Sequence, residues 1–243
     1  MDYSFLQCGE GALTVHLGDG IDPAINRRVT ALQGAIGSAG LRGITDLIPA
    51  YADLTVCYDC TVISAKALQR QLRRLLDSLS VAGQDRRRVF QLPVCYGGDY
   101  GPDLDFVCHH SGLSAQEVIE LHRAPDYLIY MLGFLPGFAY LGGLDPRLHT
   151  PRLDSPRTCI PAGSVGIGGA QTGVYPLASP GGWQLLGRTP VSVFDRQRQE
   201  PILYRAGDLV HFVPISPAEY EKIARAVAAG TYTVQVEEVP VCD

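Results

Sequence analysis

Apolar residues in the first 85 positions follow two patterns, short β-prone runs and longer runs with the spacing of a helix. Asp22 followed by Pro23 is typical of a helix start, and apolar residues then recur every three or four positions as far as Gly40. Ser64 begins a second predicted helix, with leucines on one side, that ends before Gly83. The predicted strands span residues 13–17, 44–48 and 53–58. This β-α-β-β-α order predicts a small sheet covered by two helices, as in ferredoxin-like folds.

The pattern changes after about residue 85 to many short strands separated by Gly, Pro and Asp. Ser114 with Glu117, and Ser216 with Glu219, form capping boxes that predict two helices. The predicted strands span residues 89–95, 128–132, 191–194, 202–204, 209–213 and 232–236. Many short strands with few helices predict a closed barrel or a sandwich. Because Gly83 to Arg88 break both patterns, we place a boundary there, interpret Arg86 to Arg88 as a solvated linker, and expect domains at 1–85 and 86–243.

Charge and composition exclude several function classes. The 243 residues carry 20 Lys plus Arg against 25 Asp plus Glu, so there is no positive excess for nucleic acid. No stretch approaches the roughly 20 apolar residues of a membrane helix, and the start lacks a secretion signal, so we expect a soluble, cytoplasmic protein. Neither lysine lies in a phosphate-binding loop of the Walker type. Seven scattered Cys, an odd number, predict reduced and mostly buried thiols.

The segment from Gly133 to Pro190 is rich in glycine, proline and arginine. It holds 12 of the 27 Gly, 8 of the 17 Pro, and four arginines against two aspartates. Glycine lets backbone N–H groups approach a ligand closely, and proline fixes the shape of a loop. The segment therefore fits a preformed pocket for an anion or a carbonyl, although a β-barrel also needs many tight turns.

Four blocks of this segment resemble one protein family. The blocks are GFLPGFAYLGGLD at 133–145, IPAGSVGI at 160–167, QTGVYP at 171–176 and SPGGWQLLGRTP at 179–190. They resemble, in this order, the family that contains the B-type subunit of 5-oxoprolinase, the KipI kinase inhibitor and allophanate hydrolase subunit 1. The resemblance implies an α+β protein, with a ferredoxin-like N-terminal domain and a cyclophilin-like β-barrel domain.

The resemblance also implies that the protein functions in a complex with other subunits. Members of this kind work with companion subunits of A and C type in the ATP-dependent opening of 5-oxo-L-proline to L-glutamate. We therefore expect a subunit of a cyclic-amide hydrolase that is inactive alone, with ATP used by the complex and its binding by this chain left open. The alternative is a KipI-like inhibitor of a sensor histidine kinase, with the barrel surface holding a partner protein.

Candidate site residues follow from the blocks. Arg188 is expected to contact a carboxylate or phosphate through its guanidinium, or else to form a structural salt bridge. Two histidines near the blocks are candidate proton carriers, although either could be structural. The candidates besides Arg188 are His122 and His149 for proton transfer, Gln171 and Tyr175 for orienting an amide, and the backbone of Gly163, Ser164 and Gly166 for donating hydrogen bonds. No metal site is predicted, because Cys57-x-x-Cys60 lacks a second pair.

Overall fold

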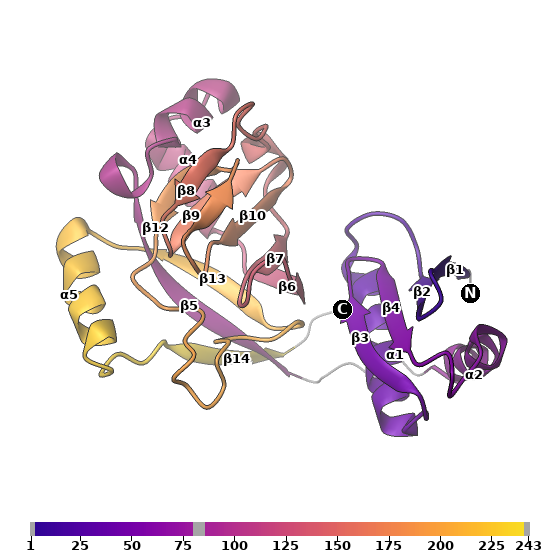
Figure 1. Ribbon diagram of the computed structural model, residues 1–243. Coiled ribbons are helices and arrows are strands. Elements are labelled where there is room, and N and C mark those ends of the chain that lie inside the picture. Colours follow the sequence, from indigo (N-terminus) through magenta and orange to yellow (C-terminus); the bar gives the residue numbers. More distant parts are fainter. Residues whose placement is uncertain (1–2, 80–85, 241–243) are drawn as a thin grey trace. The chain divides into compact units, whose positions relative to one another are not determined.

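The chain folds into two compact units, residues 1–85 and 86–243, each with its own hydrophobic core. The structure, a computed structural model, describes residues 3–79 and 86–240 (Figure 1). No helix within those ranges is long and apolar enough to cross a membrane.

The first unit is an antiparallel sheet packed against two helices. Its strands lie in the order β1-β2-β4-β3, and its core joins side chains from β2, β4 and both helices. The elements are β1 (Ser4–Cys8), β2 (Ala12–His16), α1 (Pro23–Ala39), β3 (Ile44–Pro49), β4 (Asp53–Tyr58) and α2 (Ala65–Asp77).

Local signals set the helix ends in this unit. The Asp22 side chain accepts a hydrogen bond from the backbone N–H of Ala24 at 2.6 Å, and Gly40 ends α1 with a left-handed φ of 56°. Helix α2 begins at the predicted Ser64 cap and ends at Asp77, before Gly83 as predicted. Strand β4 alternates buried and half-buried residues, as expected for a sheet with one covered face.

The ferredoxin-like assignment of this unit is not confirmed. A ferredoxin-like chain runs β-α-β-β-α-β and adds its last strand after the second helix. Here β2 lies between β4 and β1. Strand β1 comes before the first helix and was not predicted. The predicted β-α-β-β-α series is otherwise present in the predicted order.

The second unit is a closed β-barrel, which confirms the predicted barrel; its cyclophilin-like character stays a prediction. Strands β12, β9, β10, β7, β6, β13 and β5 follow one another, and the pairing of β12 with β5 closes the ring. Strand β14 (Val236–Pro240) pairs antiparallel with the first residues of β5. The barrel strands are β5 (Arg86–Tyr96), β6 (Tyr127–Leu132), β7 (Ala139–Gly142), β9 (Ser164–Gly168), β10 (Gln171–Val174), β12 (Gln184–Arg188) and β13 (Leu209–Pro214).

Smaller elements surround the barrel. Strands β8 (Arg157–Ile160) and β11 (Ser179–Gly181) form a separate two-stranded sheet. Helices α3 (Leu104–Ser111) and α4 (Ala115–Arg123) lie at one end of the barrel, and α5 (Pro217–Ala228) lies beside β5 (Figure 1). Short 3-10 turns, η1 (Gly98–Tyr100) and η2 (Pro146–Leu148), complete the unit.

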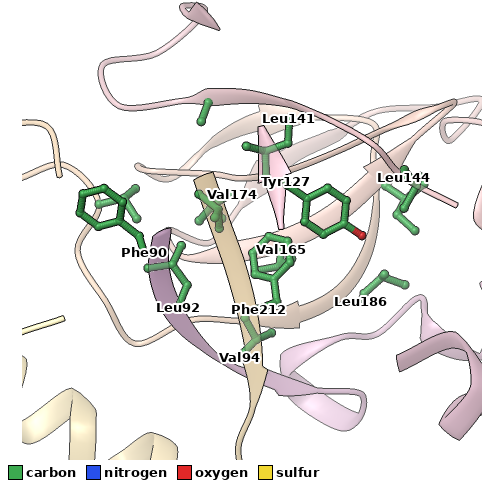
Figure 2. Packing of buried hydrophobic residues seen from close by; sticks show 14 of the residues in the cluster. Phe90, Leu92, Val94, Tyr127, Leu141, Leu144, Val165, Val174, Leu186 and Phe212 are labelled. Atoms are coloured by element: carbon green, nitrogen blue, oxygen red, sulfur yellow. The ribbon is translucent and has the colours of Figure 1, made fainter. Parts of the chain in front are cut away.

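The barrel interior is filled with apolar side chains from several strands. Leu92 and Val94 of β5, Val165 of β9 and Phe212 of β13 point toward one another in Figure 2, and all are buried. A barrel of this size is filled by its own side chains, and these apolar residues fill this one. Groups that could meet a ligand are therefore expected among the loops and the outer elements.

Several sequence predictions for this unit need correction. Arg86 to Arg88 are not a linker but the first residues of β5, where Arg88 Nη2 lies 2.6 Å from the Asp208 carboxylate. The predicted strands at 191–194 and 202–204 are joined only by a single bridge between Phe194 and Ile202. The predicted strand at 232–236 starts only at residue 236, and α3 was not predicted. Tertiary pairing decided these cases, since the local propensities were weak.

The prediction of mostly buried thiols is also wrong. The six cysteines in the described ranges are free thiols, but only Cys95 is buried. Cys8, Cys60 and Cys159 are exposed. Exposure depends on which face of an element meets the core, and short irregular segments do not reveal this in their residue pattern.

Candidate functional site

The four arginines of the glycine-rich segment separate into two that are paired and two that are not. Arg147 Nη2 lies 2.7 Å from Asp145, and this contact holds the pKa of the Asp145 carboxyl at about 2. Arg157 Nη2 lies 2.6 Å from the buried Asp103. Within the described residues, no carboxylate lies within ion-pair distance of Arg152 or Arg188. Each of these two arginines lines a different cavity, so the four do not line one common hollow.

Arg188, at the end of β12, lines a cavity of about 260 Å³. Its Nε donates a hydrogen bond to the carbonyl of Ala162 at 2.9 Å, which fixes the guanidinium against the backbone. Across the cavity, Tyr220 comes from α5; burial raises the pKa of this phenol, and the Arg188 charge opposes that rise. The cavity therefore has a cationic end and, along Ala224 and Val227 of α5, an apolar wall.

Gly163 also lines this cavity, and its backbone N–H and carbonyl are both hydrogen-bonded within the fold. It has a left-handed φ of 82°, its N–H donates to the carbonyl of Tyr175 at 2.7 Å, and its own carbonyl accepts from Thr189. A Cβ at this position would lie 2.3 Å from the Thr189 carbonyl oxygen. Gly163 therefore brings the two backbones together, and its N–H is not available to a ligand in this conformation.

Ser164 and Gly166 lie next to Gly163, where the backbones of neighbouring strands also approach closely. Both lie in β9, where Gly166 pairs with Gly173 on one side and Leu185 on the other. A Cβ on Gly166 would lie 2.7 Å from the carbonyl oxygen of Gln184. These two residues line neither the Arg188 cavity nor the one lined by Arg152, so the structure places them behind the site rather than in it.

A second cavity, of about 140 Å³, has walls made mainly of aromatic rings and is called the aromatic pocket here. Its lining consists of Phe134, Phe138, Tyr140, Tyr175 and Trp183 together with Arg152, Gly181 and Gly182. Residues from three of the four sequence blocks meet at this pocket. The predicted site residue Tyr175 is therefore separated from Arg188, although both come from the same glycine-rich segment.

His122 lies in the core of the barrel unit. It is fully buried, its Nδ1 lies 2.8 Å from the Tyr96 hydroxyl, and its Nε2 lies 2.8 Å from the Thr172 hydroxyl. Its ring stacks on Phe212 with 4.8 Å between centroids. Burial lowers the pKa of His122 from 6.5 to about 3, because the charged imidazolium would be desolvated. The imidazole is therefore neutral and held on both sides near pH 7.

The other predicted residues lie apart from both cavities. His149 is exposed at the end of η2, and its charge contributes to the low pKa of Asp145. Gln171 begins β10, where it pairs with Gly168 in the hairpin with β9. Neither lines the Arg188 cavity or the aromatic pocket. The proton-carrier role of the histidines and the orienting role of Gln171 stay predictions.

Sequence reasoning missed residues that the fold brings to the cavities. Tyr220 reaches the Arg188 cavity from α5, which lies far from the blocks in sequence. Phe134 and Phe138 stand within the recognised GFLPGFAYLGGLD block, yet no role was assigned to them. The available signal was the clustering of aromatic residues inside glycine-rich blocks. Within the described part of the chain, no group of three or more His, Cys, Asp or Glu is placed to hold a metal ion.

Comparison with known proteins bears on the whole chain. The family described as carboxyltransferase domain, subdomain C and D, matches residues 3–204. The chain is 42% identical over 228 residues to the B-type subunit of 5-oxoprolinase from Bacillus subtilis (strain 168), covering 90% of this chain and 95% of that protein. It is 45% identical over 207 residues to the B-type subunit of 5-oxoprolinase from Escherichia coli O157:H7, covering 85% of this chain and 93% of that protein.

A solved structure shows the same fold in a larger protein. The urea carboxylase of Kluyveromyces lactis superposes with a TM-score of 0.82 over 98% of this chain, which spans 24% of that protein, at 23% identity. The family resemblance seen in the sequence blocks is thus confirmed. The chain belongs to the carboxyltransferase domain, subdomain C and D, family, alongside bacterial relatives named as B-type subunits of 5-oxoprolinase.

Proposed function

We propose that this chain is one subunit of an ATP-dependent 5-oxoprolinase that opens 5-oxo-L-proline to L-glutamate. Support comes from two relatives that carry the name of this enzyme, each aligned over more than nine-tenths of its own length. A relative named as a B-type subunit has companion subunits, and we infer that those of this chain are of A and C type. A cytoplasmic location, where ATP is available, is part of this proposal.

The reaction poses a defined chemical problem. The carbonyl of a lactam is a poor electrophile, so transfer of the γ-phosphoryl group of ATP to the amide oxygen, with release of ADP, creates a leaving group. Water then adds to that carbon and the ring C–N bond breaks, with a proton going to the leaving nitrogen, which gives γ-glutamyl phosphate. A second water hydrolyses this acyl phosphate to glutamate and inorganic phosphate. Each step creates or moves negative charge, so the assembly needs fixed cationic groups that bind anions.

The observation that carries the proposal is the unpaired guanidinium of Arg188. Its Nε is fixed by the Ala162 carbonyl, while its Nη groups have no carboxylate partner among the described residues. A guanidinium held this way can bind a carboxylate or phosphate through two parallel hydrogen bonds. Gly163 and Ser164 shape the turn that presents it, and Gly166 allows β9 and β12 to pair closely. We infer that the Arg188 cavity binds the anionic group of a reactant.

The remaining roles are less directly supported by geometry. Tyr175 has a hydroxyl that can orient an amide, and Gln171 is a candidate for the same role at the start of β10. Proton transfer by His122 would require access that its burial does not provide, whereas His149 is open to solvent. The chain has no Walker-type loop, so we assign the binding of ATP to the assembled complex rather than to this chain.

Reconstitution tests the proposal. The chain is purified and assayed alone and with companion subunits of A and C type, with 5-oxo-L-proline and ATP as reactants. We expect glutamate and phosphate in equal amounts from the complex and none from the chain alone. Arg188→Gln is expected to lower kcat/KM by about 100-fold, as removal of a charge-stabilising donor does. Arg147→Gln, which removes an exposed guanidinium paired with Asp145, is the matched control and keeps activity.

A complex that forms but releases no glutamate overturns the proposal. The alternative of a kinase inhibitor has a separate readout. Stoichiometric inhibition of a sensor histidine kinase by the chain, with no turnover of 5-oxo-L-proline in the complex, would replace the proposed function.

A further inference from the structure

We propose that the aromatic pocket binds a small ring compound that carries a carboxylate, with the ring among the aromatic side chains and the carboxylate at Arg152. The pocket is distinct from the Arg188 cavity, because the two share no lining residue. The choice of 5-oxo-L-proline as the specific ring compound rests on the proposed function. The ligand class rests on the pocket itself.

The walls of the pocket are rings arranged around Phe138. Its centroid lies 5.5 Å from those of Phe134, Tyr175 and Trp183 and 5.1 Å from that of Tyr140, and all four pairs are edge-to-face. Phe138, Tyr175 and Trp183 are buried, so this part of the pocket is fixed and apolar. Edge-to-face contacts of this kind hold the rings in defined orientations, and a ring-shaped ligand would complete the set.

The size of the pocket fits one small ring. An apolar cavity of about 150 Å³ is known to hold a benzene molecule. The aromatic pocket, at about 140 Å³, therefore has room for one five- or six-membered ring, while any charged substituent must lie toward the opening. A nucleoside with its sugar and phosphates would not fit inside it.

Arg152 supplies the charge at the opening. Its guanidinium carbon lies 5.9 Å from the Trp183 ring centroid, and no described carboxylate is within ion-pair distance of it. Its positive charge also reaches the pocket floor, where it opposes the rise that burial causes in the pKa of Tyr175. A cation held over an aromatic face beside an apolar cavity is complementary to a ligand with an apolar ring and one negative charge.

Tyr175 adds a polar group on the floor. A Cβ on Gly181 would lie 2.6 Å from the Tyr175 hydroxyl oxygen, so Gly181 is required to leave space for that hydroxyl. Both residues line the pocket. A buried hydroxyl among aromatic rings can orient a polar atom of a ring, such as the amide of a lactam.

Phe134 forms the outer wall in a strained conformation. Its φ of 65° is the one left-handed value among the non-glycine residues at 3–79 and 86–240. Hydrogen bonds of Leu135 N–H to the Gly133 carbonyl at 2.7 Å, and of Phe138 N–H to the Leu135 carbonyl at 3.0 Å, hold this turn. The Phe134 side chain is 65% exposed, so burial does not compensate the strain. Strain kept without such compensation is typical of residues that contact a ligand.

The pocket contains its own reporter, because Trp183 is the single tryptophan of the chain. The fluorescence of the full chain is titrated with 5-oxo-L-proline, cyclopentanecarboxylate, 2-pyrrolidone and acetate. We expect saturable changes with the two ring carboxylates, and at least tenfold weaker binding of 2-pyrrolidone, which lacks the carboxylate, and of acetate, which lacks the ring. Equal responses to all four compounds, or a response to adenine nucleotides alone, would overturn the assignment.

Variants separate this pocket from the Arg188 cavity. Arg152→Gln and Phe134→Ala should each weaken binding of 5-oxo-L-proline at least tenfold, whereas Arg188→Gln should leave the titration unchanged. In the reconstituted complex, Arg152→Gln should raise KM for 5-oxo-L-proline with a smaller change in kcat. If neither the fluorescence nor this KM responds, the inference is wrong even if the complex is active. If the chain binds 5-oxo-L-proline but the complex does not turn it over, the proposed function fails and the pocket assignment stands.

Discussion

Arg157 Nη2 lies 2.6 Å from Asp103 Oδ1, although 54 residues separate the two in sequence. The second carboxylate oxygen of Asp103 accepts the backbone N–H of Leu185 at 2.7 Å. One buried carboxylate thus ties the segment before α3 to both β8 and β12. It also neutralises Arg157, whereas Arg152 and Arg188 have no carboxylate within ion-pair distance at 3–79 and 86–240.

Removing this carboxylate should destabilise the barrel unit. Asp103→Ala leaves Arg157 without its counter-ion and the Leu185 N–H without its acceptor, which we expect to lower the free energy of unfolding by about 3 kcal/mol. Urea denaturation followed by circular dichroism measures the change. Asp154→Ala, at an exposed carboxylate of the glycine-rich segment, is the control and should change stability by less than about 0.5 kcal/mol. Equal effects of the two substitutions would contradict the tethering role.

His122 should make stability depend on pH in a defined window. Its pKa is about 3 in the folded chain and near 6.5 when unfolded, so between these values the unfolded state binds more protons. The free energy of unfolding should therefore fall as pH drops through this window, by up to about 1.4 kcal/mol per pH unit from His122. Above about pH 7, His122 should contribute no pH dependence. His122→Gln should flatten that slope in urea denaturation from pH 4 to 8. Thr172→Val keeps the imidazole and should keep the slope. If the slope remains in His122→Gln, the pH dependence comes from other groups.

Gly163 should tolerate no side chain. Ala at this position would have a left-handed backbone and a Cβ 2.3 Å from the Thr189 carbonyl, so Gly163→Ala should destabilise the chain by at least about 3 kcal/mol. Gly169 is the matched control, since its φ is 66° but no atom lies within 4 Å of a built Cβ. Gly169→Ala should cost only about 1 kcal/mol, from the backbone alone. Midpoints of urea unfolding compare the two, and similar losses would mean that the close approach at Gly163 is not rigid.

Phe134 should reverse the usual ranking of alanine and glycine. At its left-handed φ, Ala retains the strain and Gly removes it, so Phe134→Gly should be about 1 kcal/mol more stable than Phe134→Ala. The exposed Thr158 in β8 is the control position, where Thr158→Ala should be more stable than Thr158→Gly. Thermal or urea unfolding of the four variants checks this order. The usual ranking at position 134 would show that the turn relaxes without cost.

Signals that act over a few residues were reliable in the sequence. The caps at Asp22, Ser64, Ser114 and Ser216 predicted the starts of α1, α2, α4 and α5, because a cap satisfies backbone donors within its own first turn. The ordered glycine-rich blocks identified the family, whereas the anion binding that their charge predicts stays a prediction. Short β-prone runs were less reliable, because the runs at 128–132 and 209–213 form β6 and β13 whereas the run at 191–194 makes only a single bridge.

The division of the site into two cavities could not be read from the sequence. Arg152 and Arg157 stand five positions apart in similar surroundings, yet one is paired and the other lines the aromatic pocket. The difference depends on Asp103, which reaches Arg157 only because α3 packs against β12. Tyr220 reaches the Arg188 cavity only because α5 lies beside β5.

By itself, the sequence determined the capped helix starts, most strands of the first unit, the barrel class of the second unit and the family, because caps, periodicity and ordered blocks depend on residues close along the chain. The tertiary structure alone decided that His122 is buried against Thr172, 50 residues away, and that Arg152 and Arg188 have no carboxylate partner in the described part of the chain. The physical reason is that burial and ion pairing depend on strand order and helix packing, which bring distant residues together and which no local pattern records.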